Sequence, residues 1–168
     1  NMGKYYIPQD EKDTFYKLYI KELAECNPVC LTEVHEEVGP ILIDIDLRFR
    51  LDSGLQRKYT CDDVLTIIRV YNNFIREYIE VEEDKIQAFV FEKPGPSKCI
   101  GNIKDGIHIM YPYIICNAEI QSLIRKRVIS QNLFVNLGIK NDLNDVFDEA
   151  VISRNNWLMY GSGKDRSS

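Results

Sequence analysis

The sequence has 168 residues, of which 45% are hydrophobic and 28% are charged, and at about 100–200 residues per domain this predicts a single domain over residues 1–168. A chain of this composition can bury a sizeable core, which excludes a chain that is disordered as a whole. The net charge of −5, from 21 basic and 26 acidic residues, argues against a protein that holds nucleic acid by bulk positive charge alone.

The sequence gives no sign of a membrane partner. A membrane-spanning helix needs about 20 consecutive apolar residues, which no stretch approaches, and the first residues lack the apolar core of a signal peptide. The five cysteines are an odd number at scattered spacing, without a C-x-x-C pair. We therefore expect reduced thiols, an intracellular reducing compartment and no metal cluster held by sulfur.

Hydrophobic periodicity predicts four helices and four strands. Apolar residues at helical spacing mark the helices, and β-branched and aromatic runs mark the strands. In chain order these are a helix at 10–24, a strand at 40–47, a helix at 60–79, strands at 88–91 and 107–111, helices at 118–130 and 143–150, and a strand at 157–160. Thr60 or Asp62 is the expected N-cap of the second helix.

The order of these elements predicts an α+β fold. Helices and strands are interleaved irregularly, and residues 91–107 have the pattern of a long hairpin with a loop at 93–98. Both features favour a mixed, mostly antiparallel sheet covered by helices over a doubly wound parallel sheet.

Asp44 and Asp46 lie in the most apolar of the predicted strands. Because strand side chains alternate between faces, both carboxylates are expected on one face. Like charges crowded on a core strand are costly unless a cation neutralises them, and carboxylate oxygens suit hard divalent ions such as Mg²⁺ or Mn²⁺. The alternative is a strand end whose solvated aspartates pair with Arg48 or Arg50.

His108 lies in a second apolar strand, on the face that it shares with Met110. A lone strand histidine is more often a satisfied core or surface residue than a ligand. Gly106 allows close backbone approach and Lys104 supplies a cation, and together these would suit a phosphate group.

Two further candidates lie toward the end of the chain. Asp148 ends the helix predicted at 143–150 and, taken alone, is expected to be a solvated helix acid. Lys164 follows two glycines in a segment that does not have the Walker A spacing. This segment is expected to be a flexible turn that can bring Lys164 to a phosphate.

Four segments, taken in order, resemble the archaeo-eukaryotic primase superfamily. They are LTE at 31–33, GPILIDIDL at 39–47, KDGIHIMYP at 104–112 and NWLMYGSGK at 156–164. The sequences of these four segments are most similar to the primase domain of primase–helicases from nucleo-cytoplasmic large DNA viruses, and the resemblance spans almost the whole chain.

This resemblance implies an RNA-recognition-like catalytic sheet joined to a second α/β unit. It implies that the catalytic, metal-binding carboxylates are Asp44, Asp46 and Asp148, with two Mg²⁺ or Mn²⁺ ions. It also implies that the nucleotide-binding residues are His108, Lys104, Arg154 and Lys164.

The function that the resemblance implies is a template-directed nucleotidyltransferase, a DNA primase or primase-polymerase. Its partners would be a single-stranded DNA template, nucleoside triphosphates and a fused helicase domain that lies outside this fragment, in the cytoplasm or nucleus of an infected host cell. Three alternatives stay open: a polymerase that mainly extends existing ends, a metal-dependent nuclease, and a non-catalytic nucleic-acid-binding module. A sugar-nucleotide transferase with an Asp-x-Asp site is a weaker fourth, because it leaves the segments of His108 and Lys164 unexplained.

Overall fold

The computed structural model describes residues 3–163, and the chain divides into two compact units. The small unit combines residues 1–34 with 156–168, and the large unit is His35–Asn155. In the small unit, η1 (Gln9–Glu11) leads into α1 (Lys12–Ala24), and β1 (Thr32–Glu33) pairs antiparallel with β6 (Trp157–Leu158). The assignment of 1–168 to a single catalytic domain stays a prediction.

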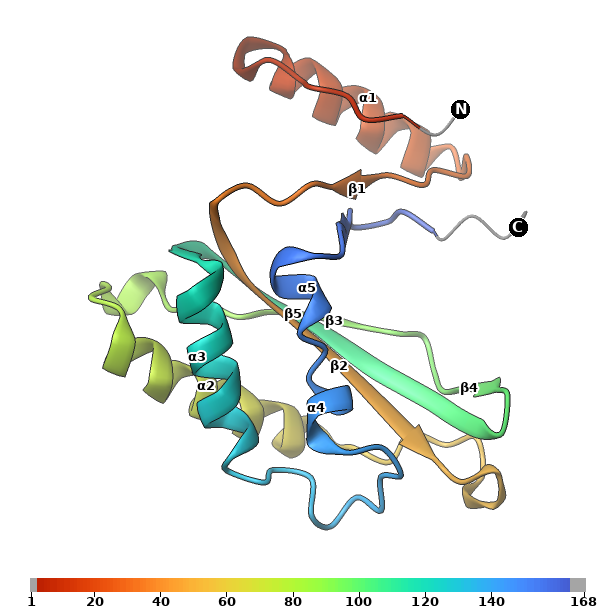
Figure 1. The fold of residues 1–168 in the computed structure, drawn as a ribbon. Coiled ribbons are helices and arrows are strands. Elements are labelled where there is room, and N and C mark those ends of the chain that lie inside the picture. The colour runs from red at the N-terminus through yellow and green to blue at the C-terminus, as the bar shows by residue number, and fades with distance from the viewer. Residues whose placement is uncertain (1–2, 164–168) are drawn as a thin grey trace. The chain divides into compact units, whose positions relative to one another are not determined.

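The large unit is built on a four-stranded antiparallel sheet (Figure 1). The long central strand β5 (Asn102–Asn117) pairs on one side with β2 (Val38–Phe49). On its other side it pairs with β3 (Phe89–Glu92) and with the short β4 (Ser97–Cys99). The predicted α+β fold with an antiparallel sheet, and the hairpin between β3 and β5, are both confirmed.

One face of this sheet holds the core because β2 and β5 alternate. The odd-numbered residues of β2 are buried from Ile41 to Phe49. Helices α2 (Cys61–Tyr78) and α3 (Ala118–Ile129) bring apolar side chains to the same core cluster. Figure 1 shows both helices lying on one side of the sheet. The even-numbered residues of β2, which include Asp44 and Asp46, therefore face away from these helices.

Side-chain caps fix where the two covering helices begin. Thr60 is the N-cap of α2 and forms a capping box, because its hydroxyl accepts from the Asp63 backbone while the Asp63 carboxylate accepts from the Thr60 backbone. Asn117 caps α3 by accepting from the Ile120 backbone. Thr60, and not Asp62, is thus the cap among the two expected residues. A short turn, η2 (Leu51–Ser53), and η3 (Glu83–Lys85) flank α2 in the chain.

The prediction of one helix at 143–150 is wrong, because the structure has two short helices there, α4 (Leu143–Val146) and α5 (Ala150–Ser153). Between them Phe147 forms an antiparallel bridge with Ile45, and the Asp148 N–H donates to the Asp44 carbonyl at 3.0 Å. These contacts with β2 replace the helical hydrogen bonds that Phe147 and Asp148 would make if the helix continued. Asp148 is therefore a residue beside β2 and not a helix acid.

The outer edge of β2 is covered along its length. The Arg48 backbone exchanges hydrogen bonds with Lys140 and Asn141, and Asn141 also donates to the Asp46 carbonyl. At the other end of the strand, the Gln121 side chain accepts from Leu42 N and donates to the Pro40 carbonyl. These bonds and the one from Asp148 take up outward-facing backbone groups from one end of β2 to the other.

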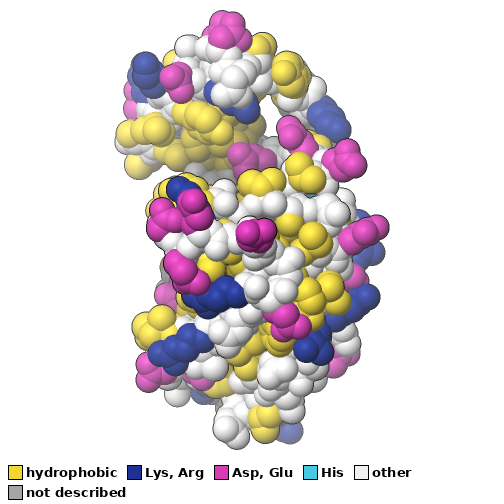
Figure 2. Space-filling model, turned by 90° about the vertical axis from the view of Figure 1, so that its left-hand side faces the viewer, with side chains coloured by type: hydrophobic (Ala, Val, Ile, Leu, Met, Phe, Trp, Pro, Cys, Tyr) yellow, Lys and Arg dark blue, Asp and Glu magenta, His cyan; other side chains and the backbone are white. Residues whose placement is uncertain are grey.

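The surface carries both signs of charge. On the face of the large unit that Figure 2 shows, basic, acidic and hydrophobic side chains are interspersed. Within residues 3–163 no helix is long and apolar enough to cross a membrane. The five cysteines are all free thiols, and only Cys116 is buried, which raises its pKa to about 11.

Candidate active site

The two aspartates of β2 face the same way and are mostly shielded from solvent. The side chains of Asp44 and Asp46 are 18% and 17% exposed. Across the ladder, Asp44 lies opposite His108 of β5, and His108 Nε2 is 3.3 Å from Asp44 Oδ1. The spacing of two residues thus places both carboxylates and the histidine on one sheet face, as the alternation predicts.

Two lysines, one in β5 and one just after β3, converge on Asp46. Lys104 Nζ lies 2.7 Å from Asp46 Oδ2, and Lys93 Nζ lies 3.9 Å from Asp46 Oδ1. Burial and the charge of Lys104 lower the pKa of Lys93, and the two aspartates oppose this shift. The alternative pairing of the aspartates with Arg48 or Arg50 is wrong, because their partners are His108 and the two lysines, and Arg50 instead pairs with Asp52 at 3.2 Å.

Lys93 is a site residue that sequence reasoning did not identify. It follows β3 directly, at the start of a segment whose prolines and glycine have the pattern of a loop. The distance between positions 46 and 93 in the chain hides their proximity. Only the register of β3 on β5, in which Phe91 lies opposite His108, brings Lys93 to the carboxylates.

Gly106 pairs with Asp46 across the ladder and allows the two strands to approach closely. A Cβ atom at this position would lie 2.5 Å from the Ile45 carbonyl oxygen and 3.4 Å from Asp46 Oδ1. The first of these atoms is backbone, so a side chain can be accommodated only if β2 and β5 move apart.

We expect Gly106→Ala to lower the free energy of unfolding by about 1–3 kcal/mol, because the added methyl group overpacks the β2 and β5 pair. Urea denaturation followed by circular dichroism measures this change. Gly39→Ala is the matched control, since a Cβ at Gly39 of β2 meets nothing within 4 Å. Equal stability of the two variants would contradict the close approach at Gly106.

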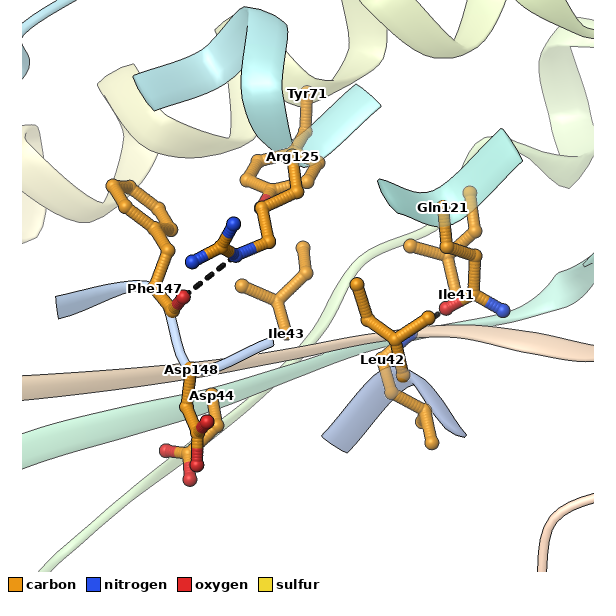
Figure 3. A pocket seen from close by; sticks show the side chains of 10 residues that line it. Ile41, Leu42, Ile43, Asp44, Tyr71, Gln121, Arg125, Phe147 and Asp148 are labelled. Carbon is orange, nitrogen blue, oxygen red and sulfur yellow. Dashed lines mark hydrogen bonds between the residues drawn. The ribbon is translucent and has the colours of Figure 1, made fainter. Parts of the chain in front are cut away.

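Asp148 is held beside Asp44 by its backbone. Besides the bond from its N–H to the Asp44 carbonyl, its Oδ1 accepts from the Ala150 N–H at 2.9 Å. Figure 3 shows the two carboxylates projecting the same way from adjacent segments, at the wall of a small pocket. The structure thus brings Asp148 to the site through the chain beside β2.

Arg125 of α3 fixes the segment that carries Asp148. Its side chain is buried, its Nε donates to the Phe147 carbonyl at 2.7 Å, and its Nη2 donates to the Asn144 carbonyl at 2.9 Å. The first of these bonds is drawn in Figure 3. A buried guanidinium satisfied by carbonyl groups supports the turn between α4 and α5, and the sequence alone does not indicate this role.

Of the two remaining basic candidates, the structure describes only Arg154. Arg154 is exposed at the C-terminal end of α5 and does not line the pocket of Asp44 and Asp148. Lys164 lies outside the described residues.

The donor atoms suit a hard divalent cation. Asp44, Asp46 and Asp148 offer carboxylate oxygens, which Mg²⁺ and Mn²⁺ prefer, and the first two carry like charges on one crowded face. As they stand, no three His, Cys, Asp or Glu side chains in residues 3–163 are grouped closely enough to hold a metal ion. Asp46 is instead paired with the two lysines and Asp44 lies beside His108, and these basic side chains are themselves groups that bind phosphate.

Comparisons with known proteins match the chain over its whole length. A family model described as the C962R protein N-terminal AEP domain, where AEP stands for archaeo-eukaryotic primase, matches residues 1–168. "Putative helicase L207/L206" of Acanthamoeba polyphaga mimivirus is 36% identical over 170 residues, which are 99% of this chain and 18% of that protein. "Putative helicase 121R" of Invertebrate iridescent virus 3 is 24% identical over 175 residues, which are 96% of this chain and 19% of that protein. The chain thus spans about a fifth of the length of the curated relatives that it matches.

Proposed function

The chain belongs to the archaeo-eukaryotic primase family of the C962R protein N-terminal AEP domain, and from this membership we propose that it is a template-directed nucleotidyltransferase, a DNA primase or primase-polymerase. The observation that carries the proposal is the pairing of acids and bases on one sheet face. Asp44 and Asp46 supply carboxylate oxygens for cations, while the Lys104 ammonium and the His108 imidazole lie 2.7 and 3.3 Å from them and offer N–H donors for a triphosphate. A polymerase site needs both.

The carboxylates of Asp44, Asp46 and Asp148 would hold the divalent ions. When bound, Mg²⁺ or Mn²⁺ would lower the pKa of the attacking 3′-hydroxyl and neutralise the leaving pyrophosphate. Each basic side chain that now faces an aspartate would turn to the phosphate oxygens. His108 and Lys104 would hold the triphosphate of the incoming nucleotide in line with the attacking oxygen, and this positioning is a large part of the catalysis.

The partners that we propose follow from the same role. A single-stranded DNA template and nucleoside triphosphates would be the substrates, and Arg154 and Lys164 would contact template or nucleotide phosphates. Since the matched relatives are named helicases and are about five times longer than the matched region, a helicase domain fused to this one is part of the proposal. An intracellular site of viral DNA replication is the corresponding location.

We expect the chain to incorporate labelled nucleotides on single-stranded DNA in the presence of Mg²⁺ or Mn²⁺, and to lose this activity when EDTA removes the ions. Gel analysis of the products and release of pyrophosphate measure the reaction. Parallel reactions with and without a supplied primer separate initiation of a new strand from extension of an existing end.

Other outcomes of this experiment correspond to the alternatives. Shortening of the DNA with no release of pyrophosphate would replace the proposal with a metal-dependent nuclease. Template binding without incorporation under either metal would replace it with a non-catalytic binding module. In either case the primase proposal for this chain would be withdrawn.

A further inference from the structure

Arg57 links strands β3 and β5 at residues that lie next to Lys93 and Lys104 in the chain. It lies between η2 and α2, outside the helices and strands. Its Nε donates to Asp105 Oδ2 at 3.2 Å, its Nη1 to Glu92 Oε2 at 2.9 Å, and its Nη2 to the Lys93 carbonyl at 2.6 Å. The guanidinium also lies over the ring of Tyr59, 4.8 Å from its centre. One side chain therefore joins the end of β3 to β5.

Asp105 anchors this arrangement. Its side chain is fully buried on the helix side of β5, between Lys104 and Gly106 in the chain, and its Oδ1 accepts from the Gly106 N–H at 2.9 Å. A buried carboxylate is costly unless a cation and hydrogen bonds satisfy it. The Arg57 guanidinium is thus held at a fixed point of the sheet.

From this fixed point Arg57 sets the path of the chain as it leaves β3. Glu92 is the last residue of β3, and Lys93 is the first residue after it. The bond to the Lys93 carbonyl holds the backbone at this exit. From there the Lys93 side chain extends to within 3.9 Å of Asp46 on the site face. A hydrogen bond to the carbonyl group of a residue restricts its backbone and thereby fixes the position from which its side chain extends.

We propose that Arg57 is a positioning residue that fixes Lys93 at the carboxylate face, where Lys93 binds a phosphate of the incoming nucleotide. This inference rests on the proposed function. The three bonds use the planar fork of a guanidinium, whose donors point in set directions. A lysine at position 57 can keep the charge beside Asp105 but has a single ammonium group, so it cannot also reach both Glu92 and the Lys93 carbonyl.

A double-mutant cycle on the 168-residue chain tests this role. The dissociation constant for a fluorescent nucleoside triphosphate in Mn²⁺ is measured for the wild type, Arg57→Lys, Lys93→Ala and the double variant. We expect each single change to weaken binding about tenfold, and the double variant to match Lys93→Ala within about twofold. The effect of Arg57 should disappear with Lys93 because Arg57 acts through it.

Arg76→Lys is the matched control. Arg76 also makes a two-pronged ion pair, with Glu83 at 2.7 Å, but this pair is exposed on α2 and η3. We expect nucleotide binding of this variant to equal that of the wild type. Circular dichroism at the assay temperature checks that Arg57→Lys is folded. Additive losses in the cycle, or unchanged binding by Arg57→Lys, would overturn the positioning role.

A second readout keeps this inference separate from the proposed function. The rate of acetylation of Lys93, relative to that of Lys85 on η3, reports how firmly Lys93 is held. We expect this ratio to rise about threefold or more in Arg57→Lys, as local opening becomes easier. If the wild type binds no nucleotide, the proposed function fails, and the acetylation ratio alone decides the positioning. An unchanged ratio would then overturn it.

Discussion

Changing Asp44 and Asp46 together to asparagine is expected to lower nucleotide incorporation by more than about 10³-fold. Asparagine keeps the size of the side chain but replaces the charged carboxylate with a neutral amide. The site therefore loses the anionic oxygens that suit a divalent ion, and it loses the charged partners of His108 and Lys104. Single-turnover incorporation on a primed template measures the loss.

The same double change should leave the fold intact. The three charge contacts that it removes, from His108, Lys104 and Lys93, are partly exposed, and such contacts contribute little, so the free energy of unfolding should change by no more than about 1 kcal/mol. Asp84→Asn, on an exposed carboxylate of η3, is the matched control and should retain full activity. Incorporation by the double variant at the rate of the wild type would rule out these carboxylates as the catalytic pair.

Changing Arg125 to methionine is expected to lower the free energy of unfolding by about 2–4 kcal/mol. Methionine replaces the apolar stem of the side chain but cannot donate, so the carbonyl groups of Phe147 and Asn144 lose their donors in a buried place. Because these bonds hold the segment that carries Asp148, incorporation should also fall, by about tenfold or more. Urea denaturation measures the change in stability, and the incorporation assay, run without urea and well below the unfolding temperature, measures the change in activity.

Arg127→Met is the control for this change. Arg127 lies on the same helix, but it is half-exposed, pairs with Glu77 at 3.8 Å and lies over the ring of Phe74. Its replacement should cost less than about 1 kcal/mol and leave incorporation unchanged. If the two arginine variants were equally stable and equally active, the support that we assign to Arg125 would be wrong.

Local sequence patterns predicted much of this fold. Helices α1, α2 and α3 and strand β2 lie where hydrophobic periodicity places them, within about two residues at each end. The common face of Asp44 and Asp46 follows from the alternation of strand side chains alone. The resemblance to archaeo-eukaryotic primases, carried by the motifs around these residues, is confirmed by the family match.

The errors occur where long-range contacts decide the structure. Strand β5 is 16 residues long although only 107–111 was expected, because Lys104, Asp105 and Gly106 break the apolar pattern while the ladder to β2 continues through them. Asp105 is buried by its pairing with Arg57, which no periodicity can reveal. The helix predicted through 147 ends early because Phe147 pairs with β2.

The covered edge of β2 also affects how this protein self-associates. An apolar strand with open backbone groups is a template for intermolecular pairing and aggregation. Here the outer edge of β2 is occupied by Gln121, Asn141 and Asp148. A second copy therefore cannot add a strand beside β2, the strand that carries Asp44 and Asp46. The opposite edge is formed by β3 and the short β4, and β3 ends at Glu92, directly before Lys93. Aggregation at high concentration should therefore start at β3, and added charge on that strand should improve solubility without disturbing the acids.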